Sequence, residues 1–161
     1  MIFWNPDFKD LSEIDQKLDF AFVPFVKRTA LEELANCVEL NDGFNLIVRW
    51  KPEDIRSGVS DLSVFEFAKE RGFKIYRNKD LHLKLFVYQN DQAFLTSGNL
   101  TGRGLGQQEN RNLEVGVKVG LEPNDWTQMY KIIEESVEVT QEMVDWLAEH
   151  ATPGKSESNM P

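Results

Sequence analysis

Four residues of this 161-residue chain carry side chains that could together attack a phosphodiester without a metal ion. His82 has an imidazole that can act as a nucleophile. Lys84 and Asn99 provide a cation and an amide that could hold phosphate oxygens. Glu114 provides a carboxylate that could fix the tautomer of the imidazole. These residue types predict metal-independent phosphoryl transfer if the fold brings them together.

A strand expected over residues 81–88 would carry His82 and Lys84 on one face. Side chains two residues apart in a strand lie about 6–7 Å from each other on the same side. The opposite face of this strand would be apolar: Leu81, Leu83, Leu85 and Val87. A hairpin at 89–91 would join it to a second strand, which would deliver Ser97 and Asn99 at its end. The hairpin strand is expected over 92–96 and a further strand over 112–119, which would bring Glu114 alongside.

The elements expected before this hairpin alternate between strand and helix. They cover residues 19–26, 27–38, 45–50, 62–71 and 73–76, with a turn at 41–43. Such an order is typical of a sheet with parallel strands and right-handed crossovers. Two terminal helices are expected over 126–139 and 141–149. We therefore predict an α/β fold with a mixed, partly parallel β-sheet flanked by helices.

Length and composition predict a single domain over residues 1–150 and a disordered tail over 151–161, which is rich in Pro, Gly and Ser. The N-terminus lacks the basic flank and long apolar segment of a signal peptide, and no apolar run is long enough to span a membrane. Cys37 is the single cysteine, which fits a reducing compartment. These features favour a cytoplasmic protein without membrane association.

The formal net charge of −9 argues against a protein that coats nucleic acid non-specifically. It does not argue against a nuclease, because only the local field at the site must be positive. Two histidines and one cysteine leave little material for a zinc site, and no dense group of carboxylates marks a magnesium site. We expect neither a metal nor another cofactor.

The pattern His-x-Lys, then Ser-x-Asn, then a downstream acid resembles the phospholipase D superfamily. Residues 19–120 resemble its compact, single-motif (HKD) bacterial nucleases, a branch that includes the catalytic domains of metal-independent restriction endonucleases. Two positions depart from the family pattern: Gln89 stands where an Asp is frequent, and Thr96 where a Gly is found. The resemblance implies a phospholipase D-like fold.

The resemblance also implies a role for each motif residue. His82 would form a covalent phosphohistidine, Lys84 and Asn99 would bind the non-bridging phosphate oxygens, and Glu114 would hold the histidine ring. Ser97 would add a hydrogen bond. The implied activity is that of a phosphodiesterase or endonuclease that cleaves nucleic acid, with DNA as the expected substrate.

The family's chemistry uses two such motifs, whereas this chain carries one. His150 is not followed by a lysine two residues later, so it does not start a second motif. We therefore expect a symmetric homodimer, with each subunit contributing His82, Lys84 and Asn99 to a shared site.

Other interpretations of the chain stay open at this point. A phospholipase or phosphatidyl transferase is disfavoured, because no amphipathic stretch rich in Lys and Arg is present. A non-catalytic nucleic-acid-binding or assembly module is a further alternative. The chain could also be the catalytic domain of a restriction enzyme with a separate DNA-recognition domain or subunit, since it contains no recognition helix, zinc finger or basic stripe.

Three more residues are candidates for substrate binding. Thr101 and Arg103 belong to a glycine-rich loop that could present backbone amides to phosphate, or could be a mere connector. Arg49 stands at the end of a predicted strand, where it could line the site or form a surface ion pair.

Overall fold

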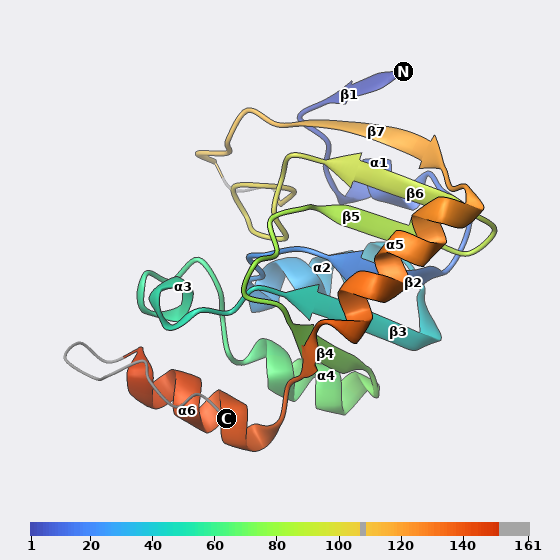
Figure 1. The fold of residues 1–161 in the computed structure, drawn as a ribbon. Coiled ribbons are helices and arrows are strands. Elements are labelled where there is room, and N and C mark those ends of the chain that lie inside the picture. Colours follow the sequence, from blue (N-terminus) through green and yellow to red (C-terminus); the bar gives the residue numbers. More distant parts are fainter. Residues whose placement is uncertain (107–108, 152–161) are drawn as a thin grey trace.

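The computed structural model describes residues 1–106 and 109–151, and it contains one eight-stranded mixed sheet (Figure 1). The spatial order of the strands is β1-β7-β6-β5-β2-β3-β4-β8. In chain order the strands are β1 Ile2–Trp4, β2 Leu18–Phe22, β3 Leu40–Val48, β4 Lys74–Arg77, β5 Leu85–Tyr88, β6 Gln92–Thr96, β7 Val115–Gly120 and β8 Val137–Glu138. The helices are α1 Phe8–Ser12, α2 Arg28–Cys37, α3 Pro52–Arg56, α4 Val64–Arg71, α5 Pro123–Glu134 and α6 Gln141–His150.

The predicted fold class is confirmed. Strands β2, β3 and β4 are parallel, and helices α2, α3 and α4 lie in the crossovers between them. The other neighbouring pairs in the sheet are antiparallel. The expected hairpin between β5 and β6 is present, and its tip places Asn90 and Asp91 at positive φ. Asn and Asp are the non-glycine residues that tolerate this conformation best.

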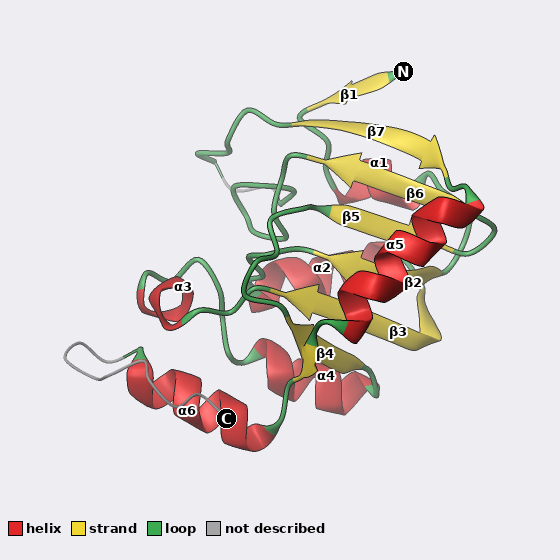
Figure 2. Cartoon of the chain, in the orientation of Figure 1, coloured by secondary structure: helices red, strands yellow, loops and turns green. Residues whose placement is uncertain are grey.

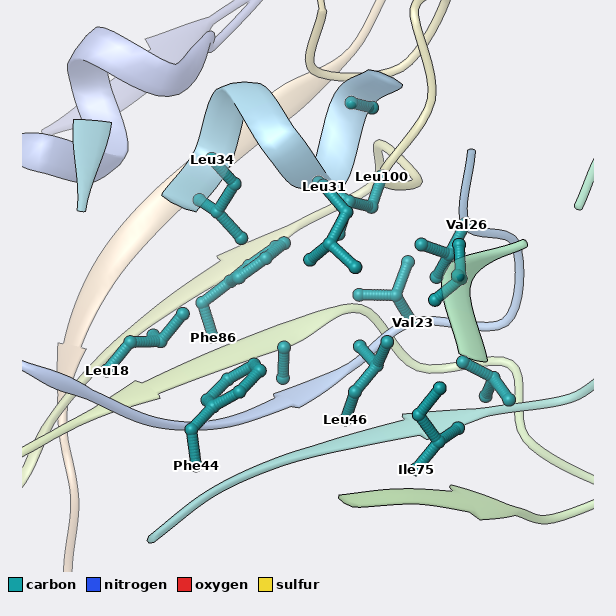
Figure 3. Packing of buried hydrophobic residues seen from close by; sticks show 14 of the residues in the cluster. Leu18, Val23, Val26, Leu31, Leu34, Phe44, Leu46, Ile75, Phe86 and Leu100 are labelled. Atoms are coloured by element: carbon teal, nitrogen blue, oxygen red, sulfur yellow. The ribbon is translucent and has the colours of Figure 1, made fainter. Parts of the chain in front are cut away.

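Helices cover both faces of the sheet (Figure 2). On one face, α1, α2, α4 and α6 share a large apolar core with the strands. Figure 3 shows part of this core, with Leu31 and Leu34 of α2 pointing toward Phe86 of β5. On the other face, α5 covers a smaller cluster that includes Met129, Phe22 and Val87. The sheet is thus held from both sides, which fixes the loops at its edges.

The strand predicted over residues 81–88 is wrong in its first half. β5 begins at Leu85, so His82 and Lys84 precede the strand rather than lie within it. The predicted alternation is nevertheless present, because the two leucines that flank His82 pack with the cluster under α5.

The shorter strand has a simple cause in the neighbouring strands. On one side, β2 ends opposite Leu85. On the other side, the Thr96 N–H bonds to the Lys84 carbonyl at 3.2 Å, after which the Ser97 N–H bonds to the start of β7 instead. Residues 81–83 therefore lie beyond the last backbone pair with either neighbouring strand. A β-strand forms only where a neighbouring strand pairs with its backbone.

The predicted helix over 126–139 is also wrong at its C-terminal end. α5 ends at Glu134, and Val137 and Glu138 form β8, which pairs antiparallel with β4. The Asn78 side chain donates to the Ser136 hydroxyl at 3.2 Å just before this strand. β-Branched residues at 137 and 139 favour a strand where an edge is available.

Two further differences concern the N-terminal third. The turn expected at 41–43 lies inside β3, at an irregularity where the pairing with β2 shifts between Leu40 and Asn45. No element was predicted before residue 19, whereas β1 pairs with β7 and α1 carries a capping box formed by Asp7 and Asp10. The tail predicted over 151–161 lies outside the described residues, except for its first residue.

Candidate functional site

The sheet topology brings the predicted site segments to one edge. β5 begins beside the end of β2, because Phe22 pairs with Leu85 in antiparallel register. β6 ends beside that point, and β7 begins next to it, with Thr96 paired to Gly116. The segments that carry His82, Lys84, Asn99 and Glu114 follow or precede these strand ends, so they share this edge (Figure 1).

His82 is exposed at this edge. The segment before it is held by two hydrogen bonds, from the Asn78 N–H to the Val48 carbonyl at 2.9 Å and from the Leu81 N–H to the Asn78 carbonyl at 3.1 Å. His82 lines a cavity of about 300 Å³ together with Asp80 and Glu135. The backbone around His82 is therefore anchored, while its ring is accessible.

Lys84 is partly buried, and this burial lowers the pKa of its ammonium group. The carboxylate of Glu114 acts in the opposite direction and raises the pKa of Lys84. The two side chains are thus close enough to interact electrostatically, although they are thirty positions apart in the chain. A phosphate next to Lys84 would likewise favour the charged form of the amine.

Glu114 is held by both its side chain and its backbone. The Ser97 hydroxyl donates to Oε2 of Glu114, and the Val115 N–H donates back to the Ser97 hydroxyl at 2.9 Å. The Glu114 N–H donates to Oδ1 of Asn5 at 3.0 Å, and the Asn5 N–H donates to the Glu114 carbonyl at 2.8 Å. Within the described residues no hydrogen bond joins Glu114 to the His82 ring, so that contact stays a prediction.

Asn99 is oriented by the loop that follows β2. Its Oδ1 accepts a hydrogen bond from the Phe25 N–H at 3.2 Å. The carbonyl end of the side-chain amide is thereby engaged, which leaves the Nδ2 group as the end that can donate to a ligand. Asn99 lines a cavity of about 400 Å³ with Thr101 and Arg103, two of the other predicted binding residues. His82 lies against the separate cavity described above.

The glycine-rich loop is fixed against Asn99. The Gly104 N–H donates to the Thr101 hydroxyl at 3.0 Å, and the Gly106 N–H donates to the Thr101 carbonyl at 2.9 Å. Leu105 is fully buried. A Cβ on Gly104 would lie only 2.2 Å from the Asn99 carbonyl oxygen, so only glycine permits this approach. This packing shows that the loop is held in place, and its role in substrate binding stays a prediction.

Arg49 forms an ion pair at the end of β3. Both its Nε and its Nη2 groups donate to the carboxylate of Asp54, which is only 3% exposed. These hydrogen bonds raise the pKa of Arg49. The guanidinium also lies 4.8 Å from the centre of the Phe25 ring. Arg49 therefore packs on Phe25, the residue whose N–H orients Asn99. Of the two roles predicted for Arg49, the ion pair is the one observed, and its partner Asp54 is buried.

Three residues that hold the site were not predicted from the sequence. Asn5 binds the backbone of Glu114, and Phe25 binds the side chain of Asn99. Nη2 of Arg111 donates to the Pro6 carbonyl at 2.7 Å and to the Gly104 carbonyl at 2.8 Å, which ties the N-terminal segment to the glycine-rich loop. The Asn-Pro pair at positions 5 and 6 is a turn signal that could have identified the first of them; Asn5 has a φ of 51°.

Residues 1–106 and 109–151 contain no group of three or more His, Cys, Asp or Glu side chains placed to hold a metal ion. None of their helices is both long and apolar enough to cross a membrane.

No protein-family model and no curated protein sequence matches this chain. Its structure is similar to that of Nuc from Salmonella typhimurium, a phospholipase D family member, with a TM-score of 0.60 and 13% sequence identity over 88% of this chain and 97% of Nuc. It is also similar to NucT from Helicobacter pylori, with a TM-score of 0.55 and 13% identity over 86% of this chain and 98% of NucT. The fold predicted from the motif, that of the phospholipase D superfamily, is confirmed.

Proposed function

We propose that this chain is a metal-independent phosphodiesterase that cleaves nucleic acid, with DNA as its substrate, through a covalent intermediate on His82. The observation that carries the proposal is the meeting of the four motif segments at one edge of the sheet, where the carboxylate of Glu114 raises the pKa of Lys84. The fold shared with a phospholipase D family member supports it. The active site is completed by a second copy of the chain.

Lys84 and Asn99 bind the phosphate of the substrate. The ammonium group and the free Nδ2 end of the amide supply donors to the non-bridging oxygens of the scissile phosphate. Thr101 and Arg103 line the cavity next to Asn99, where they would contact the nucleotide beside that phosphate. Two copies of Lys84 at one site would offset the net charge of −9 locally.

In the first step, a ring nitrogen of His82 attacks the phosphorus. A nitrogen–phosphorus bond forms, the bond from phosphorus to the leaving oxygen breaks, and that oxygen takes a proton from the partner's His82. Glu114 accepts a hydrogen bond from the other ring nitrogen of His82 and so keeps the attacking nitrogen unprotonated. One carboxylate oxygen of Glu114 already accepts from Ser97, which leaves the other for the imidazole.

In the second step, water attacks the phosphohistidine and gives its proton to the partner's His82, which is now neutral. The nitrogen–phosphorus bond breaks, and its electron pair returns to the ring of His82. Over the cycle the partner's His82 gives one proton to the leaving oxygen and takes one from water, so both histidines end as they began. A single histidine cannot serve as nucleophile and general acid at the same time, which is why the proposal requires two subunits.

The test is cleavage of a labelled DNA oligonucleotide in the presence of EDTA. We expect activity in the wild type, none in His82→Ala, and wild-type activity in His150→Ala. His150 is the appropriate control because it is the other histidine of the chain, and its ring stacks on Trp146 in α6. Acid-free quenching during turnover, followed by peptide mass spectrometry, should find phosphate on His82.

Three outcomes would contradict the proposal. Loss of wild-type cleavage in EDTA would exclude the metal-independent mechanism. Full activity of His82→Ala would exclude the nucleophile. Hydrolysis of phosphatidylcholine vesicles without cleavage of nucleic acid would favour a phospholipase instead.

A further inference from the structure

The cavity beside Asn99 is built by four separate segments of the chain. It is lined by residues from within 25–29, 58–59 and 99–103 and by Asn112. Its volume of about 400 Å³ lies within the range of about 300–1,000 Å³ that is usual for small-molecule sites. The glycine-rich loop and α3 both lie beyond the edge of the sheet that carries the candidate site (Figure 1). The cavity therefore belongs to the surroundings of that site.

The wall that the loop after α3 contributes is held in place. Nζ of Lys27 donates to the Gly58 carbonyl at 2.9 Å and to Oδ1 of Asp61 at 2.8 Å. The Val26 N–H donates at 3.0 Å to the hydroxyl of Ser60, which is buried. Because the glycine-rich loop is fixed as well, the cavity is preformed. A preformed cavity reduces the conformational entropy that must be lost when a ligand binds.

The lining combines apolar surface with uncharged polar groups. Phe25 and Val59 supply an aromatic ring and an aliphatic side chain. Phe25 stays partly exposed although Arg49 packs on its ring. Within the described part of the chain, no hydrogen bond engages the side-chain amide of Asn112 or the hydroxyl of Thr29, and both residues line the cavity. A planar ligand with apolar faces and hydrogen-bonding edges matches this combination.

The charge of the lining also limits the choice of ligand. None of the described residues that line the cavity is acidic, although 27 of the 161 residues of the chain are Asp or Glu. The cationic residues of the lining are Lys27, which is paired with Asp61, and Arg103, whose Nε group donates to the Asn110 carbonyl at 2.9 Å. The cavity thus does not repel a polyanion. An uncharged part of a nucleotide, bound beside its phosphate, fits this distribution better than the phosphate itself.

We infer that this cavity is a nucleobase subsite, which binds one unpaired base next to the scissile phosphate with Phe25 as the stacking surface. The inference rests on the proposed function, in which Asn99, a residue of the cavity wall, donates to that phosphate. His82 lines the separate cavity, so a phosphate in contact with both residues has the nucleobase subsite on its Asn99 side. Stacking on an aromatic ring tolerates every base. Asn112 and Thr29 supply the groups that meet the edge of the base.

The test replaces one nucleotide at a time in a labelled single-stranded DNA oligonucleotide with an abasic tetrahydrofuran residue. The cuts made by the wild-type chain are then mapped for each oligonucleotide. We expect cleavage to become about ten-fold less efficient at the phosphate that lies at one fixed offset from the abasic residue, as for the loss of one stacked base. Cleavage at phosphates further from the abasic residue should change little.

Two variants assign this effect to the cavity. Phe25→Leu removes the ring but keeps the backbone N–H that orients Asn99, and Val59→Glu places a carboxylate in the cavity. Both should cut the intact oligonucleotide about ten-fold less efficiently and should no longer discriminate against the abasic residue. Val137→Glu is the matched control, because this valine is 57% exposed on β8. The control should discriminate like the wild type, and thermal unfolding checks that each variant is folded.

Binding without cleavage is measured by fluorescence anisotropy in His82→Ala. The probes are the intact oligonucleotide and a tetrahydrofuran oligomer of the same length, which has the phosphates but no bases. We expect at least ten-fold weaker binding of the second probe, and a smaller difference when Phe25→Leu is added. Equal binding of the two probes would show that phosphate alone is recognised and would overturn the nucleobase subsite.

The remaining results separate the two proposals. Cleavage that is insensitive to abasic residues at every position overturns the nucleobase subsite and leaves the proposed chemistry standing. Discrimination that persists in both Phe25→Leu and Val59→Glu overturns the subsite as well, because the base then binds elsewhere. Base-dependent binding that is lost in Phe25→Leu, in a protein that cleaves no phosphodiester, supports the subsite and overturns the proposed function.

Discussion

The side-chain oxygen of Asn99 accepts a hydrogen bond from the backbone N–H of Phe25 at 3.2 Å. The bond joins two loops that are 74 residues apart in the sequence but follow neighbouring ends of the sheet. It has a chemical consequence, because the amide can no longer rotate freely. The oxygen is turned toward the protein, and the Nδ2 group is the end that can meet an anion.

This orientation predicts the behaviour of Asn99→Asp. The new carboxylate can still accept from the Phe25 N–H, so the thermal midpoint should change little. It replaces the donating amide with a negative oxygen that repels phosphate, and we expect kcat/KM to fall by about 10²–10³-fold, as for the loss of one oxyanion donor. Steady-state kinetics and thermal unfolding of the same samples test this. A variant that binds substrate as tightly as the wild type would show that Asn99 does not contact the phosphate.

The close approach of Gly104 to Asn99 predicts the effect of Gly104→Ala. Its Cβ would lie 2.2 Å from the Asn99 carbonyl oxygen and 2.7 Å from the Asn99 nitrogen, so the loop must move. We expect a loss of about 1–3 kcal/mol in the free energy of unfolding, as for other overpacked sites, and weaker substrate binding. Urea unfolding measures the first and KM the second.

The control for this variant is Gly43→Ala, because nothing lies within 4 Å of a Cβ at position 43. Its free energy of unfolding should stay close to that of the wild type. Equal destabilisation of the two variants would mean that the contact with Asn99 is not the cause.

The central part of this fold could be predicted from the sequence because its signals are local. The apolar runs around Phe22 and Ile47 and the amphipathic pattern of α2 identify the parallel strands and their crossover. The hairpin at Asn90 could be predicted for the same reason, since turn residues stand between two apolar strands.

The start of β5 could not be predicted in this way. The sequence around Lys84 alternates like a strand, but a strand also needs a neighbouring strand to pair with. The pairing with β2 ends at Leu85, and the pairing with β6 ends at Lys84. The short pairing of Val137 with Arg77 was missed for a related reason, because it depends on an edge that only the folded sheet provides.

The motif residues of the candidate site could be proposed from residue types and spacing, whereas the contacts that hold them could not. Phe25 holds Asn99 through its backbone N–H, which leaves no trace in the residue type. Asn5 accepts from the Glu114 N–H with its side chain, but a turn signal at Asn5 does not indicate this partner 109 positions away. Such long-range contacts require the folded chain.

The ion pair between Arg49 and Asp54 predicts a coupled loss of stability and binding. Asp54 is buried, so Arg49→Met would leave its carboxylate without the guanidinium, at a cost of about 3 kcal/mol in the free energy of unfolding. The same change removes the cation from the Phe25 ring, and we expect KM to rise more than kcat falls. Denaturant unfolding and steady-state kinetics measure these effects. Glu32→Gln, which removes one exposed carboxylate that pairs with Arg28, should leave both nearly unchanged.

The environment of Lys84 predicts the pH dependence of activity. Burial lowers the pKa of Lys84, so the phosphate-binding amine should lose its proton, and kcat/KM should decline, at a lower pH than for an exposed lysine. Glu114 raises the pKa of Lys84, so Glu114→Gln should move this alkaline limb to still lower pH.

The same pKa shift predicts a pH dependence of stability. The folded state holds the proton of Lys84 less tightly than the unfolded state does. The contribution of Lys84 to the free energy of unfolding therefore rises with pH between the lowered pKa of Lys84 and the pKa of a free lysine. Lys84→Met should abolish cleavage and remove that rise. A pH–rate profile of the wild type and Glu114→Gln, with urea unfolding of Lys84→Met across the same range, measures each effect. An alkaline limb that is unchanged in Glu114→Gln would mean that another group titrates there.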